Sequence, residues 1–249
     1  MKQEPASIIL SVRGLETRFG SHVIHHELDL DVQSGELLVL FGGSGTGKST
    51  LLRALIGLDR AAGGSIEFEG ESVEFQSERS WREVRRRIGY SFQNGALFDS
   101  LSVGENLEYP LREFTRLSAD ERRKASDEML ERVGLPGIRS LYPAQLSGGM
   151  QKRAGLARTL MLDPTVILYD EPTAGLDPAN TKMMAALMLD LKAQGRTGIL
   201  VTHDVPCARM VGDRFAFLQD KKIAVIQTRN ELEAAADPRL AAYMQGDIA

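Results

Sequence analysis

A glycine-rich segment between two regular patterns constrains the fold of this chain more than any other feature. The segment, residues 41–50, reads FGGSGTGKST. It fits the pattern G-x-x-x-x-G-K-[ST] at Gly42, Gly47, Lys48 and Ser49. An apolar run over 37–41 precedes the segment, and a helical pattern over 51–58 follows it. Since this pattern requires a strand before it and a helix after it, the sequence predicts a phosphate-binding loop.

The residue types of the loop explain how it would hold a nucleotide. Glycines let the backbone curl until several N–H groups point at one centre, and the positive end of the following helix adds to them. We expect Lys48 to reach the β- and γ-phosphates and the Ser49 hydroxyl to bind Mg²⁺. The residues predicted to contact ATP here are Gly42, Gly43, Ser44, Gly45, Thr46, Gly47, Lys48, Ser49 and Thr50. The alternative is a flexible Gly/Ser linker, which the flanking strand and helix disfavour. The loop alone does not separate kinases, GTPases and transport ATPases.

The length and composition allow one large α/β domain with a small inserted subdomain. The 249 residues are 43% apolar, and the formal net charge of −4 gives no general attraction to nucleic acid. The one cysteine, Cys207, excludes an intrachain disulfide, which suits a reducing cytoplasm. Residues 1–11 lack a signal-peptide pattern, and no apolar run approaches the ~20 residues that cross a bilayer. If the protein acts at a membrane, we expect another chain to supply the membrane part.

Strand-like and helix-like patterns alternate along the chain. Short apolar runs over 37–41, 166–169 and 198–202 are typical of parallel strands buried on both faces. The segments 8–30 and 65–75 alternate in polarity instead, and we expect them to form a small antiparallel sheet. The sequence therefore predicts an α/β protein with a mostly parallel sheet covered by helices.

The middle of the chain carries two helix starts. Capping-box patterns occur at Ser102 with Glu105 and at Ser118 with Glu121. Gly134 ends the second of these helices. We interpret residues 93–162 as a mostly helical insertion. Residues 230–249 are predicted to form a helical tail with little core signal.

Further motifs appear in a definite order along the chain. Gln93 follows a strand pattern, and residues 146–150, LSGGM, open a helix. Residues 166–171, VILYDE, are four apolar residues followed by two carboxylates, with Leu176-Asp177 soon after. Residues 198–203, GILVTH, form a strand pattern that ends in histidine.

Together with the phosphate loop, this ordered set resembles the ATP-binding cassette (ABC) family. The resemblance runs from about residue 9 to residue 225. It implies the fold of a P-loop NTPase, with a RecA-like core, a small antiparallel β subdomain and an inserted helical subdomain. The core with the β subdomain is expected over 1–92 and 163–229, the helical signature subdomain over 93–162 and the C-terminal helical tail over 230–249.

The resemblance implies roles for residues near the ends of the predicted strands. Asp170 is expected to hold Mg²⁺ through water and Glu171 to polarise the attacking water, since consecutive strand side chains point to opposite sides. His203 is expected to contact the γ-phosphate, Gln93 to link Mg²⁺ to the helical insertion, and Phe19 to stack on adenine. The alternatives are a salt-bridged carboxylate pair, a structural histidine and ordinary packing of the aromatic ring. The predicted catalytic set is Lys48, Glu171 and His203, and the predicted Mg²⁺ ligands are Ser49, Gln93 and Asp170.

The family resemblance also implies a second copy of the chain. Ser147, Gly148 and Gly149 resemble the signature that binds the γ-phosphate of a nucleotide held by another cassette. Asp177 is placed among the ATP-binding residues on the same resemblance. Two cassettes of the family close head-to-tail over two ATP molecules, and this chain has one loop and one signature, so we expect a homodimer.

One departure from the usual signature narrows the resemblance. Met150 stands where the family has glutamine, and because methionine cannot make the same hydrogen bonds, we assign it no ligand role. Methionine at this position resembles the branch of Mla- and Mce-type lipid transporters. Segments typical of that branch are FQNGALF at 92–98, YPLRE at 109–113, THDV at 202–205 and DPR at 237–239.

This narrower resemblance implies a function. It is that of the ATPase subunit of a bacterial inner-membrane ABC transporter that moves phospholipid between membranes and maintains outer-membrane lipid asymmetry. The implied partners are an integral membrane permease and periplasmic or membrane-anchored lipid-binding subunits, with the chain lying peripherally on the cytoplasmic face. The alternatives are the ATPase of an amino-acid, metal or lipoprotein transporter, and a non-transport ABC protein acting on DNA, ribosomes or cell division. Non-transport relatives usually carry two cassettes, long coiled coils or metal-binding inserts, and none is visible in this sequence.

The remaining clusters have simpler interpretations. The arginines at 82 and 85–87 are expected to form a solvated helix face rather than a nucleic-acid patch, because no aromatic residues are interleaved with them. The histidines at 22, 25 and 26 are expected at exposed polar positions, since they lack the partners of a metal site. Some of Leu97, Phe98 and Leu101 are expected to form part of the groove that receives the membrane partner. The tail from Asn230 is a candidate brace for the dimer.

Overall fold

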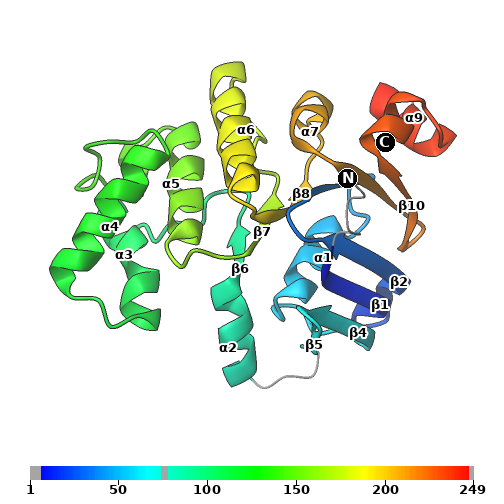
Figure 1. The fold of residues 1–249 in the computed structure, drawn as a ribbon, viewed down its shortest axis with the longest axis horizontal. Coiled ribbons are helices and arrows are strands. Elements are labelled where there is room, and N and C mark those ends of the chain that lie inside the picture. The colour runs from blue at the N-terminus through cyan, green and yellow to red at the C-terminus, as the bar shows by residue number, and fades with distance from the viewer. Residues whose placement is uncertain (1–6, 74–77, 247–249) are drawn as a thin grey trace, which may run out of the picture.

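The computed structural model describes residues 7–73 and 78–246. Parts of three sequence predictions fall outside these ranges, namely residues 1–6 of the segment examined for a signal peptide, residues 74–75 of the alternating segment and residues 247–249 of the tail. The described residues form two β-sheets with helices around them (Figure 1).

The larger sheet carries the strands whose ends form the candidate site. From edge to edge it consists of β10 (Lys222–Thr228), β9 (Arg214–Gln219), β3 (Leu37–Phe41), β8 (Thr197–Val201), β7 (Val166–Asp170) and β6 (Ile88–Ser91). All neighbouring pairs are parallel except β10 with β9. Every residue of β3, β7 and β8 is buried, which confirms the three predicted buried strands to within one residue at each end. Because parallel strands end on the same edge, the segments that follow β3, β7 and β8 meet there.

The smaller sheet is antiparallel, as the alternating segments predict. Its order is β2 (His22–Gln33), β1 (Ile8–Phe19), β4 (Gly63–Phe68) and β5 (Glu71–Ser72). Its inner face and one face of the larger sheet both pack on helix α1 (Lys48–Leu55). Leu51, Leu52 and Leu55 of α1 are fully buried in this shared core, so the loop before α1 is held between two sheets.

All the secondary structure between residues 93 and 162 is helical, in agreement with the expected insertion. It consists of α3 (Val103–Phe114), α4 (Ala119–Arg132), a 3-10 turn (Pro143–Gln145) and α5 (Gly148–Leu160), and α2 (Glu78–Arg87) precedes it. Both predicted capping boxes form, at Ser102 with Glu105 and at Ser118 with Glu121. These helices have a core cluster of their own, and Figure 1 shows α3, α4 and α5 grouped at one end of the molecule. We propose residues 93–162 as the helical signature subdomain.

The opposite face of the larger sheet is covered by the last helices of the chain. They are α6 (Pro178–Ala193), α7 (Val205–Val211), α8 (Arg229–Glu233) and α9 (Pro238–Gln245). Leu232, Leu240 and Tyr243 are buried in this core, so the prediction that the tail carries little core signal is wrong. Each tail helix is too short to show an apolar period, and α8 buries only Leu232. Every helix of the described residues is too short or too polar to cross a bilayer.

Two predictions about charged clusters have different outcomes. Arg82, Arg86 and Arg87 are exposed, which confirms the solvated face of α2, whereas the half-buried Arg85 donates to backbone carbonyls of residues 56 and 57. His25 is fully buried, so its predicted exposure is wrong. Its ring meets the Thr17 hydroxyl with an Nδ1 to Oγ1 distance of 2.7 Å, and burial lowers its pKa to about 4. The other two histidines of the cluster, at 22 and 26, are exposed as predicted.

Candidate active site

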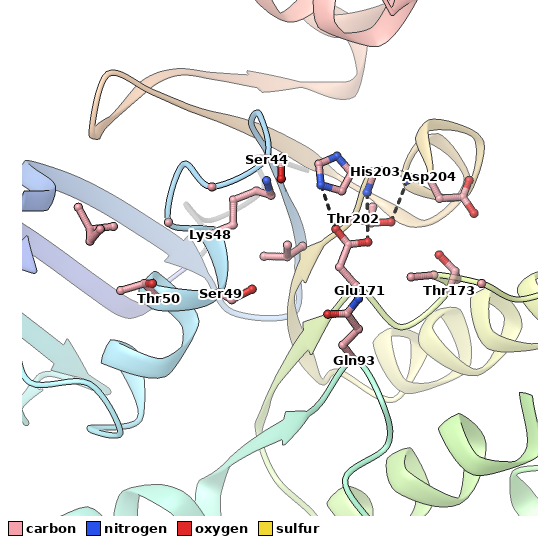
Figure 2. Close-up of a pocket in the computed structure, with 16 residues that line it drawn as sticks. Ser44, Lys48, Ser49, Thr50, Gln93, Glu171, Thr173, Thr202, His203 and Asp204 are labelled. Carbon is pink, nitrogen blue, oxygen red and sulfur yellow. Dashed lines mark hydrogen bonds and ion pairs between the residues drawn. The ribbon is translucent and has the colours of Figure 1, made fainter. Parts of the chain in front are cut away.

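A pocket of about 670 Å³ opens at the edge where β3, β7 and β8 end. Figure 2 shows Lys48 and Ser49 reaching it from the glycine-rich loop, with Glu171, His203 and Gln93 on the facing side. The pocket is lined by residues of the loop, of β2 and of the segments after β6, β7 and β8: Ile24, Ser44, Gly45, Gly47, Lys48, Ser49, Thr50, Gln93, Glu171, Thr173, Ala174, Gly175, Val201, Thr202, His203 and Asp204. The fold thus gathers segments that lie up to 180 positions apart in the sequence, from Ile24 to Asp204.

The loop can take its shape only because glycine stands at position 47. Gly47 has a φ of 103°, in the region that side chains with a Cβ avoid. A Cβ there would lie 2.4 Å from Cγ2 of Ile24 and 2.7 Å from Nε2 of His25. Strand β2 therefore packs directly against the loop, and the buried ring of His25 lies next to Gly47.

Lys48 places a cation inside the loop. Its Nζ donates hydrogen bonds to the carbonyls of Gly42 and Gly43, each at 2.8 Å. Burial lowers the pKa of Lys48, while the nearby Glu171 and Asp170 carboxylates oppose that shift. Lys48 is also the first residue of α1, so its ammonium lies beside the N–H groups at the helix start, an arrangement that favours an anion such as a phosphate.

Ser49 and Asp170 are joined on the other side of the loop. The Ser49 hydroxyl donates to Oδ1 of Asp170 at 2.8 Å, and the Tyr90 hydroxyl donates to Oδ2 at 2.7 Å. Burial and the bond to Asp170 raise the pKa of Tyr90, so its hydroxyl stays protonated. The Ser49 hydroxyl, the Asp170 carboxylate and the side-chain amide of Gln93, which lines the same pocket as Ser49, all offer oxygen atoms of the kind that Mg²⁺ prefers. The described residues contain no group of three or more His, Cys, Asp or Glu side chains suited to a metal. Mg²⁺ is usually held by one or two carboxylates and keeps water and phosphate ligands, and the Ser49, Asp170 and Gln93 donors are of a kind that would allow this.

Glu171 and His203 line the same pocket and contact each other there. Oε1 of Glu171 lies 3.3 Å from Nε2 of His203, and its Oε2 accepts from the backbone N–H of His203 at 3.4 Å. Glu171 has a φ of 50°, which is uncommon for a residue with a Cβ, and its N–H donates to the carbonyl of Val201. Burial raises the pKa of the Glu171 carboxyl, although His203 and Lys48 oppose the shift. A carboxylate with a raised pKa is a better proton acceptor than an exposed one.

Several contacts of the site involve residues that sequence reasoning did not select. Lys152 of α5 donates to the carbonyls of Glu171 and Ala174, at 3.1 and 2.5 Å. The Tyr90 bond to Asp170 and the Tyr243 contact with His203 span 80 and 40 positions. Tyr90 could have been suspected from its place near the end of a predicted strand, whereas nothing in the sequence near Tyr243 points to the site.

The other predicted ATP-binding residues lie outside the pocket. Phe19 ends β1 with 54% of its surface exposed. Ser147 caps α5 by accepting from the N–H of Met150, and Gly148 beside it is exposed. Asp177 caps α6 by accepting from the N–H of Asn180. The Asn180 side chain lies against Gly149, so the signature residues and Asp177 lie next to each other.

The comparisons with known proteins agree with this geometry. The sequence model of a family described as "ABC transporter" matches residues 25–174. The chain is 42% identical over 243 residues to "Probable ribonucleotide transport ATP-binding protein mkl" of Mycobacterium leprae, covering 97% of this chain and 70% of the relative. It is 38% identical over 247 residues to "Intermembrane phospholipid transport system ATP-binding protein MlaF" of Escherichia coli strain K12, covering 99% and 91%.

Solved structures are similar over most of the chain. A dimeric ATP-binding cassette in a post-hydrolysis state with bound ADP and Pi is 30% identical, with a TM-score of 0.83 over 88% of this chain and 98% of that one. A nucleotide-free cassette from an ABC transporter is 23% identical with a TM-score of 0.83 over 95% of this chain and 98% of that one, which shows the shared fold alone. The chain therefore belongs to the ABC transporter family, and it is an ABC ATPase that binds and hydrolyses ATP.

Proposed function

We propose that this ATPase drives a bacterial inner-membrane transporter that moves phospholipid between membranes and so maintains outer-membrane lipid asymmetry. The observation that carries the proposal is the match over 91% of the Escherichia coli relative named for intermembrane phospholipid transport. The Mycobacterium leprae relative is named for ribonucleotide transport and is 42% identical, so ribonucleotide is the second candidate cargo. Amino-acid, metal and lipoprotein transport are further alternatives within the family.

The site supports a mechanism in which this chain's residues bind ATP and direct water. The Lys48 ammonium and the N–H groups of the loop would neutralise the phosphates. Mg²⁺, held by Ser49, Asp170 and Gln93, would supply additional positive charge at the phosphates. Glu171, with its raised pKa, would orient the attacking water and accept its proton. We assign to His203 a contact with the γ-phosphate.

We propose that a second copy of the chain completes the site. Ser147, Gly148 and Asp177 are exposed and lie outside the pocket, so they are free to meet a nucleotide held by another copy. The helix start at Ser147 and the backbone of Gly149 suit an anion. The similar structure with bound ADP and Pi is a dimer, which supports a head-to-tail homodimer closing over two ATP molecules.

We propose that a membrane permease docks on an apolar groove between α2, α3 and α5. The groove has a volume of about 460 Å³. Its lining includes the partly exposed Leu58, Phe92 and Phe98, together with Tyr109 and Phe114. Of the three residues expected in this groove, only Phe98 lines it, since Leu97 packs on the helical core and Leu101 lies outside.

The docking proposal has a direct test. Phe98→Asp places a charge in the groove and should release the permease from the purified complex while ATP affinity is retained. Met210→Asp is the matched control, because Met210 is 49% exposed on α7, outside the groove. If the permease co-purifies equally with Phe98→Asp and with Met210→Asp, the groove is not the docking site.

The cargo proposal is tested on the complex purified from membranes. We expect an integral permease and periplasmic or membrane-anchored lipid-binding subunits to co-purify, with the ATPase peripheral on the cytoplasmic face. In reconstituted vesicles, ATP should drive movement of labelled phospholipid, and a complex carrying Lys48→Ala should not. Movement of labelled ribonucleotide without movement of phospholipid would overturn the lipid assignment in favour of the second cargo.

A further inference from the structure

The last described helix, α9, packs onto the edge of the sheet that carries the active site. Tyr243 is buried, and its ring lies against Phe41 of β3 and Phe217 of β9, with centroid distances of 5.4 and 5.3 Å. Leu240, one turn earlier on the helix, is fully buried in the same cluster. Packing on both strands therefore fixes where the Tyr243 hydroxyl lies.

That hydroxyl touches two elements of the active site. It donates a hydrogen bond to the carbonyl of Gly42, the first residue of the phosphate loop, at 3.2 Å. It also lies 3.0 Å from Nδ1 of His203. Burial raises the pKa of Tyr243, so the hydroxyl keeps its hydrogen. One side chain from the tail thus bridges the loop and the histidine.

The Tyr243 hydroxyl has one hydrogen for its two contacts, with Gly42 and with His203. A hydroxyl has one hydrogen to donate, and a carbonyl can only accept, so the contact with Gly42 uses that hydrogen. The contact with His203 is then a hydrogen bond only if Nδ1 donates to the tyrosine oxygen. If the hydroxyl donated to Nδ1 instead, the Gly42 and Tyr243 oxygens would face each other without a hydrogen between them.

We propose that Tyr243 is a positioning residue, which holds the His203 ring with its hydrogen on Nδ1 and thereby directs Nε2 at Glu171 and the pocket. Nε2 lies 3.3 Å from Oε1 of Glu171, and with a hydrogen on Nδ1 this contact is a hydrogen bond only when Nε2 or the Glu171 carboxyl also carries a proton. The tautomer depends only on the contacts described above. The kinetic consequence rests, in addition, on the role proposed for Glu171 and His203 in ATP hydrolysis.

The tautomer is measured directly by ¹⁵N NMR of the full chain with labelled histidine. The chain has only four histidines, and the His203 signals are assigned from their absence in His203→Gln. At about pH 8.5, we expect a protonated, pyrrole-like Nδ1 in the wild type. In Tyr243→Phe, Nδ1 should lose that hydrogen in a large share of the molecules. An unprotonated Nδ1 in the wild type overturns the proposal whether or not the variant folds.

Kinetics separate positioning from packing. Loss of one hydrogen bond predicts a kcat for ATP about fivefold lower in Tyr243→Phe, with KM changed less than twofold. Leu240→Val is the matched control, because it loosens the same helix and leaves the hydroxyl in place. An equal loss of kcat in Leu240→Val, or the same His203 spectrum in Tyr243→Phe and wild type, contradicts the proposal. If the tautomer changes in Tyr243→Phe and kcat does not, the positioning stands and the role proposed for His203 in hydrolysis fails.

Discussion

Replacement of Gly47 by alanine tests whether strand β2 limits the shape of the phosphate loop. Two costs apply to this substitution. The φ of 103° costs a residue with a Cβ about 1–2 kcal/mol. The overlap of the new Cβ with Ile24 and His25, at 2.4 and 2.7 Å, adds about 1–3 kcal/mol if the neighbours shift to relieve it. The sum predicts a loss of about 2–5 kcal/mol.

Gly45→Ala is the matched control in the same loop. Gly45 has a φ of 76°, but a Cβ built on it meets no atom within 4 Å. Only the backbone cost of about 1–2 kcal/mol applies to Gly45→Ala. The difference between the two variants therefore isolates the overlap with β2.

Thermal unfolding and ATP titration measure the two variants. At about 2–4 °C per kcal/mol for a chain of this size, Gly47→Ala should lower Tm by about 4–20 °C and Gly45→Ala by about 2–8 °C. If the loop, rather than β2, shifts to relieve the overlap, the same cost weakens ATP binding instead. Gly47→Ala should then bind ATP about 5- to 150-fold more weakly than Gly45→Ala. Equal Tm values together with equal ATP affinities in the two variants would refute the reasoning.

Three further predictions concern single side chains of the site. Lys48→Ala should abolish ATP turnover in a phosphate-release assay, because the cation inside the loop is lost; retained turnover contradicts the assignment of the loop. Tyr90→Phe removes the donor to Asp170 and should change the Mg²⁺ concentration for half-maximal turnover by about fivefold, with an unchanged value as the opposing result. The folded-state pKa of His25, lowered from 6.5 to about 4, means that the unfolded chain binds a proton that the native chain does not. The free energy of unfolding should therefore fall by about 3 kcal/mol between pH 6.5 and 4. In His25→Gln this acid-dependent loss should be smaller. Chemical denaturation measures it across this pH range, and identical pH profiles for His25→Gln and the wild type would contradict the role of His25.

Much of the fold could be predicted from the sequence because its strongest signals are local. The three buried strands are continuous apolar runs, and the capping boxes at Ser102 and Ser118 lie within four residues of the helices they begin. The phosphate loop carries its whole pattern within eight residues. Each of these features depends on neighbours in the chain, so a single sequence contains the information.

The predictions that failed depend on contacts between distant segments. His25 lies in a strand of alternating polarity, and its burial follows from the phosphate loop packing over it. The tail joins the core through Leu240 and Tyr243, and the Tyr243 ring contacts Phe41 of β3, about 200 positions earlier. The position of Tyr243 against His203 likewise requires the sheet to be assembled first. Such contacts leave no periodic pattern in the sequence.

The most direct test of the account is the oligomeric state of Glu171→Gln with ATP. In the proposed mechanism, one chain contributes half of each catalytic site, and hydrolysis, directed by Glu171, reopens the dimer. The variant keeps the shape of the side chain but removes the proton acceptor, so it should bind ATP and elute as a stable dimer in size-exclusion chromatography with light scattering. Wild-type protein with ATP should return to monomer as ATP is consumed. A variant that binds ATP yet remains monomeric would contradict the account.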